Sequence, residues 1–152
     1  ADIQANRLYT NSSRLVAEQG ALNINATKSL SNDFGLISAA KGITVNTDSM
    51  VNNFATIHTA GDITINTGWL DQLASGSVDK NNAAGVISSG NNLMLNVGND
   101  FSNFGWITGA NSTSVTATGT LYNHNTIYSQ IAPMFTGRLA CTTTVLLSAI
   151  VH

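Results

Sequence analysis

Apolar and polar residues alternate through short segments of this chain, and the segments return about every twenty residues. The clearest copies are residues 43–47, which read ITVNT, and residues 63–67, which read ITINT. Alternation with a period of two predicts a half-buried β-strand rather than a helix. Repetition at a fixed period near twenty is typical of a solenoid, so we expect each repeat to form one coil that buries its apolar face against the next coil.

Each repeat contains a long strand and a short one. The residues expected to face inward in the long strands are Leu22, Ile24, Ile43, Val45, Ile63, Ile65, Leu93, Leu95, Val115 and Ala117. In the short strands they are Val16, Ile37, Ile57, Ile87, Ile107 and Ile127. Members of the short-strand series follow at twenty residues, except for steps of twenty-one after Val16 and thirty after Ile57. The longest step predicts one coil that carries ten extra residues.

A third recurring element joins the two strands. Its copies are residues 30–34, 50–54 and 101–104, with a weaker copy at residues 121–124. We expect the first residue of each copy and its phenylalanine to face the core, as large apolar side chains usually do. These phenylalanines are Phe34, Phe54 and Phe104. We expect the asparagine of each copy at the corner where the chain turns, because Asn tolerates a left-handed backbone.

Together these elements predict an all-β fold, a parallel β-helix of about six coils. A β-sandwich is the alternative, and it is disfavoured because sandwiches do not hold so regular a register. We expect the solenoid to occupy residues 1–137, with an insertion at residues 68–82 that leaves and re-enters on one face. Within the insertion, Trp69, Leu70 and Leu73 have the spacing of one helical turn. Residues 138–152 form an apolar tail that either caps the last coil or is foreign to the natural fibre.

Composition narrows the functional classes. Charged residues make up 9% of the chain against the usual quarter, and the formal net charge is −2. Such a chain offers no basic surface for nucleic acid or anionic lipid. It contains no apolar run long enough to span a bilayer as a helix. Its polarity comes instead from 19 Asn and 18 Thr residues, while a single cysteine, Cys141, leaves no intrachain disulfide.

The ionisable residues suggest no catalytic or metal site. Enzymes that cleave polysaccharides on this fold need clustered carboxylates, and no two acidic residues here lie one period apart. His58 is expected to face solvent, with no thiol or acid at ligand spacing. We therefore expect no enzymatic activity, no metal and no cofactor.

Aromatic residues outside the core pattern are the candidates for surface contacts. Trp106 precedes the inward Ile107 and should point outward, as should Tyr128 one coil later. Trp69 belongs to the expected insertion. Exposed aromatic rings stack on sugars or on other proteins, so these three residues are candidate contacts. The alternative is that they pack beneath the insertion or the tail.

The repeats resemble those of filamentous haemagglutinin and of related two-partner-secretion exoproteins, including haemolysins and contact-dependent growth-inhibition proteins. The resemblance rests on a recurring L-x-N-x-G-x-I-x-[ST]-x-G-x-[LI]-x-[LIV]-[NT] pattern. Its best copies are residues 30–47, 50–67, 82–97 and 101–117. The resemblance implies a right-handed β-helix within a fibre that an outer-membrane transporter exports from a Gram-negative bacterium. The Asn-Pro signatures of the family's secretion domain are absent, so any transporter contact is expected from a domain outside this chain.

Two functional hypotheses follow. The first is a structural or adhesive shaft that presents a distal adhesin or toxin and contacts a receptor or glycan on host or target cells. It implies a virulence-associated protein that is secreted or displayed on the cell surface. The alternative is a glycan-binding or carbohydrate-active β-helix that uses Trp69, Trp106 and Tyr128.

Overall fold

The computed structural model describes residues 1–72, 85–131 and 133–141, which form fourteen strands and no helix. The long strands are β1 (Asp2–Tyr9), β3 (Ala21–Ser31), β5 (Gly42–Val51), β7 (Asp62–Asp71), β9 (Asn92–Val97), β12 (Ser112–Asn123) and β14 (Met134–Cys141). The short strands are β2 (Arg14–Ala17), β4 (Leu36–Ala39), β6 (Thr56–Thr59), β8 (Val86–Ser89), β10 (Phe101–Asn103), β11 (Trp106–Gly109) and β13 (Thr126–Ser129).

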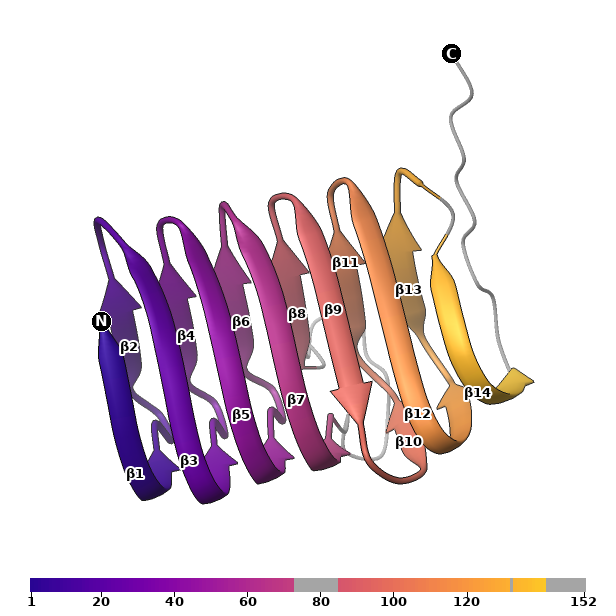
Figure 1. Ribbon diagram of the computed structural model, residues 1–152, viewed down its shortest axis with the longest axis horizontal. Helices are drawn as coiled ribbons and strands as arrows, with labels where there is room; N and C mark the ends of the chain where they lie inside the picture. Colours follow the sequence, from indigo (N-terminus) through magenta and orange to yellow (C-terminus); the bar gives the residue numbers. More distant parts are fainter. Residues whose placement is uncertain (73–84, 132, 142–152) are drawn as a thin grey trace.

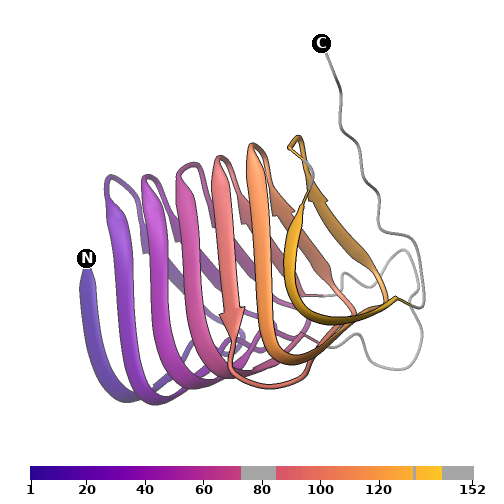
Figure 2. The same ribbon diagram turned by 45° about the vertical axis from the view of Figure 1, so that its right-hand side comes forward.

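The strands form two parallel sheets that wind together as a β-solenoid. One sheet has the order β1-β3-β5-β7-β9-β12-β10, with β14 also paired to β12, and the other has the order β13-β11-β8-β6-β4-β2. Figure 1 shows the resulting coils side by side along the long axis, with the sheet of β2, β4, β6, β8, β11 and β13 behind the long strands. Figure 2 shows that the long strands also curve at their lower ends, so that one strand contributes to two sides of each coil.

The register confirms the twenty-residue period. Ile37 pairs with Ile57, and Ile57 pairs with Ile87 across the longer step. The series continues to Ile107 and Ile127 in the same register. All five isoleucines are fully buried, so they form one continuous column of the core. The prediction of about six stacked coils is therefore confirmed.

The first coil departs from the predicted register. Leu15, rather than Val16, pairs with Ile37 and packs against the core, while Val16 is 42% exposed. The reason is a bulge in β3: pairing with β1 shifts from Ala5–Ala26 to Arg7–Ser29, which adds one residue to the offset. Counting twenty-one residues back from Ile37 therefore lands one position away from the buried side chain. The prediction for Val16 was wrong.

The corner at the end of the long strands contains a buried ladder of amides, which confirms the predicted corner position of the asparagines. Its members, all fully buried, are Asn32, Asn52, Gln72, Asn103 and Asn123. Successive amide nitrogens donate to the next amide oxygen over 3.0, 3.3, 3.2 and 2.9 Å. At the lower end the Thr10 hydroxyl donates to Asn32 Oδ1 over 2.7 Å, and at the upper end Asn123 Nδ2 donates to the Asn125 carbonyl over 2.9 Å.

The ladder also binds the backbone where the short strands begin. Asn52 Nδ2 donates to the Val86 carbonyl over 3.3 Å, and Asn103 Nδ2 donates to the Thr126 carbonyl over 3.2 Å. A buried carbonyl without a partner costs free energy, and only a side chain that can both donate and accept serves the turn and the ladder together. The corner asparagines therefore face the core because their amides donate hydrogen bonds to backbone carbonyls there.

Gln72 keeps the ladder continuous where the chain leaves the regular coil. Strand β7 runs through Asp71, so Trp69 and Leu70 lie in a strand and not in the expected helical turn. Gln72 forms a parallel bridge with Asn103, and the described chain resumes at Gly85. Leu73 and the remainder of the expected insertion lie outside the described residues, as do residues 142–152 of the expected tail, whose roles stay predictions.

We predict that Asn52→Ala destabilises the fold by about 2–4 kcal/mol, because it removes the donor to the buried Gln72 side-chain oxygen and one acceptor of the Asn32 amide. The matched control is Asn66→Ala, which removes an exposed amide that is also bonded on both sides. This control should cost less than about 1 kcal/mol, because water replaces the lost bonds. Urea unfolding measures both values, and equal losses would contradict the importance of the buried ladder.

Candidate functional site

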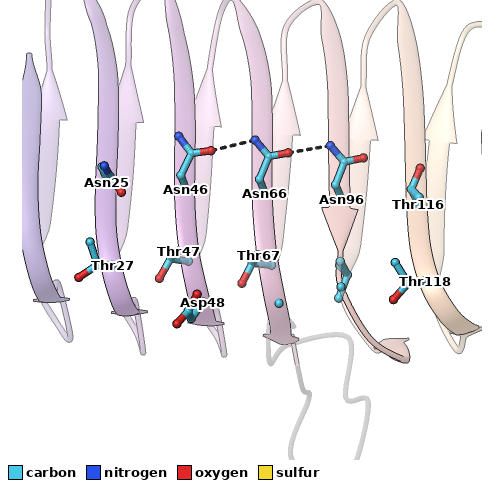
Figure 3. Close-up of a pocket in the computed structure, with 13 residues that line it drawn as sticks. Asn25, Thr27, Asn46, Thr47, Asp48, Asn66, Thr67, Asn96, Thr116 and Thr118 are labelled. Carbon is cyan, nitrogen blue, oxygen red and sulfur yellow. Dashed lines mark hydrogen bonds between the residues drawn. The ribbon is translucent and has the colours of Figure 1, made fainter.

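The most distinct surface feature is a groove on the outer face of the long strands. It follows one row of polar residues that share a register on five neighbouring strands: Asn25, Asn46, Asn66, Asn96 and Thr116. Neighbouring members are one strand spacing apart, about 4.8 Å. Figure 3 shows the row crossing the coils along the rod. We refer to these five residues as the polar row.

Three members of the polar row form an exposed amide ladder. Asn66 Nδ2 donates to Asn46 Oδ1 over 2.9 Å, and Asn96 Nδ2 donates to Asn66 Oδ1 over 2.7 Å (Figure 3). The side chains of Asn25 and Thr116 share the register of the ladder but form no hydrogen bond to another described residue. The two ends of the polar row thus keep hydrogen-bonding capacity for a ligand or for water.

Small residues beside the polar row give the groove its depth. Thr27, Asp48, Gly68, Gly98 and Thr118 line it where the strands bend, and its volume is about 630 Å³. Gly68 and Gly98 lie against each other, since a Cβ on Gly98 would come within 3.2 Å of Gly68 Cα. The absence of side chains at these two positions lets the backbones of neighbouring coils approach closely where the strands bend.

Two inward threonines hold the bend beneath the groove. The Thr47 hydroxyl donates to the Ser49 carbonyl over 3.1 Å, and the Thr67 hydroxyl donates to the Trp69 carbonyl over 2.8 Å. The repeated Asn-Thr pair therefore places an amide on the outer face and a hydroxyl against the turning backbone. These two hydrogen bonds hold the backbone of β5 and β7 in its bend beside the groove.

The chemistry of the groove is that of neutral hydrogen bonding. Among the described residues that line it, only Asp48 carries an ionisable side chain. Within the described parts of the chain, no three His, Cys, Asp or Glu side chains lie close enough to hold a metal ion. His58 is exposed on β6, where the sequence places it. The site can bind hydroxyls and amides, and it offers no evident acid–base pair.

The three aromatic residues predicted as surface contacts do not converge on one site. Trp106 is 54% exposed on β11, and the half-buried Tyr128 lies on the adjacent strand β13 of the same sheet. Trp69 is 58% exposed on β7 of the other sheet, directly after Gly68 of the groove. The structure thus separates Trp69 from the other two.

The predicted positions of the corner phenylalanines were wrong. Phe34 is 66% exposed and stacks on the partly exposed Phe54 with ring centroids 5.2 Å apart. Phe104, also partly exposed, stacks on His124 at 4.3 Å. The backbone φ values of Phe34 and Phe54 are 54° and 52°, so the chain turns sharply there and the rings point away from the core. The inward position at this corner belongs to the amide ladder.

Analysis of the sequence did not single out the polar row. The signal was present, because Asn46 and Asn66 occupy the same place in the two clearest repeats, and Asn25 and Asn96 extend the series. Outward polar residues on alternating strands normally indicate only a solvated face. What the sequence could not show is that the row borders a groove where the strands bend.

Comparisons with known proteins bear on the whole rod. The family profile described as the haemagglutinin repeat matches residues 1–65 and 69–125, which is more than half of the chain. Comparison with curated proteins finds no match, and comparison with solved structures finds none either. In the described part of the chain there is no helix that could cross a membrane.

We predict that Phe34→Ala costs less than about 1.5 kcal/mol, because it removes an exposed stacked ring. The matched control is Phe101→Ala on β10, where the side chain is fully buried, and it should cost about 3–5 kcal/mol. Thermal or urea unfolding of the two variants gives the comparison. A larger loss for Phe34→Ala than for Phe101→Ala would contradict the outward position of the corner ring.

Proposed function

Because the chain belongs to the haemagglutinin repeat family, we propose that it is a shaft segment of a secreted or surface-displayed bacterial exoprotein. In this role the rod holds a distal adhesin or toxin away from the cell. The family is structural and adhesive rather than enzymatic. Export is expected to use an outer-membrane transporter that recognises a domain outside this chain, as in two-partner secretion.

The observation that carries this proposal is the continuity of the register. The isoleucine column runs from Ile37 to Ile127, and the amide ladder runs beside it through the same coils. Every coil satisfies its neighbour by the same contacts, so the height of the rod grows by about 4.8 Å per coil. A rod built in this way can be extended coil by coil, and its role as a spacer does not depend on a reactive site in any one coil.

The second hypothesis, a carbohydrate-active β-helix, has less support. It requires Trp69, Trp106 and Tyr128 to act together, and they lie on different sheets. Of the three, only Trp69 is next in sequence to a residue that lines the groove, Gly68. We infer that any contact with a glycan is a property of the groove rather than of this aromatic set.

The shaft proposal is tested by removing one period. Deleting residues 46–65 joins Val45 to Asn66 and keeps the inward and outward alternation of the strand. We expect the shortened chain to fold cooperatively and its rod to be about 4.8 Å shorter by small-angle X-ray scattering. In the exoprotein that carries the segment, export and antibody access to the distal domain should be retained.

The matched control deletes residues 46–64, one residue fewer, and places the inward residues Val45 and Ile65 in succession. Because a slip of one residue turns every following side chain to the wrong face, this variant should lose cooperative unfolding. The shaft proposal fails if the twenty-residue deletion folds normally but the distal domain is no longer displayed.

A further inference from the structure

We propose that the groove along the polar row is a binding site for a neutral, extended glycan that lies parallel to the rod axis. This goes beyond a shaft role, since a spacer would function with an empty groove. The starting observation is the row itself, with one hydrogen-bonding side chain on each of five successive long strands. Repetition at about 4.8 Å suits a linear polymer whose units are repeated polar rings.

The hydrogen bonds within the polar row leave amide donors and acceptors unused at both ends of the exposed ladder. The Asn46 side chain accepts a hydrogen bond from Asn66, and its amide nitrogen donates to no other described residue. The Asn96 side chain donates to Asn66, and its amide oxygen accepts from no other described residue. Asn25 and Thr116 extend the row beyond these ends. The row therefore offers amide donors toward its N-terminal coils and an amide acceptor and a hydroxyl toward its C-terminal coils. Sugar hydroxyls both donate and accept, so they match both halves.

The mutual bonds also fix the middle of the row before a ligand arrives. Asn66 is bonded on both sides, and Thr67 beneath it is tied to the turning backbone. Side chains that are already ordered lose less entropy on binding, which increases the affinity that a given set of contacts provides. Gly68 and Gly98 line the groove with backbone atoms alone, so a sugar ring can reach the backbone there.

Charge determines the class of glycan. Asp48 is the ionisable residue among the described groove residues, and the lining contains no lysine or arginine. A sulfated or carboxylated glycan would meet a negative charge with no cation to pair with it, which opposes binding. A neutral glycan meets no such cost. Exposed Trp69 follows Gly68 directly and adds an aromatic surface beside the bend, of the kind that stacks on the apolar face of a sugar.

The test uses the full chain and isothermal titration calorimetry. The probes are short cello-, malto- and galacto-oligosaccharides, with a heparin-derived oligosaccharide of similar length as the sulfated arm. We expect at least one neutral series to bind and the heparin fragment to bind none. The double variant Asn25→Ala/Thr116→Val should weaken neutral binding by about tenfold or more, because it removes both ends of the row and leaves the central ladder intact.

The matched control is Thr64→Val on β7, an outward threonine on the same face that does not line the groove. It should bind the glycan as the unmodified chain does, and unfolding midpoints should show that all variants are folded. The proposal is overturned if none of the neutral series binds, if the heparin fragment binds as tightly as they do, or if the double variant binds unchanged. Any of these results leaves the shaft proposal standing, because that proposal depends on export and length.

Discussion

The structure depends on one constraint: each coil must present its polar corner atoms to partners in the coil above and below. In a parallel β-helix the strand backbones pair along the rod, and here the carbonyl that begins a short strand also accepts from a corner amide. Here the amides of Asn32, Asn52 and Asn103 bond both to one another and to these carbonyls. Once this vertical register is set, apolar columns, turns and surface rows all repeat in the same places.

The outer surface follows from the same register. A residue type that recurs in the repeat becomes a continuous row along the rod, so that one outward asparagine per coil gives the polar row and one corner aromatic gives stacked rings. A mutation in one coil therefore changes one unit of a linear array. This is a suitable architecture for contacts that are spread along a surface, in contrast to the single deep pocket of an enzyme.

Much of the fold could be predicted from the sequence, since the period and the alternation fix which strands stack and which faces are buried. The inward Ile37, Ile57 and Ile87 were identified in this way. The corner was predicted in part: the asparagines lie where the repeat places them, but hydrophobicity alone favours Phe34 inside, and its ring is exposed. Val16 was misplaced because a bulge in β3 changes the count by one residue. The groove was missed because an outward polar row by itself indicates only a solvated face.

The buried ladder also has a direction. From Thr10 to Asn123 every side chain donates toward the C-terminal coils, whereas the exposed amides of Asn66 and Asn96 donate toward the N-terminal coils. Side-chain amide dipoles orient in the field of the protein, so the inner column carries a polarity along the rod axis that the outer column opposes. The inside and the outside of the same coils are therefore polarised in opposite senses, even though the chain carries little formal charge.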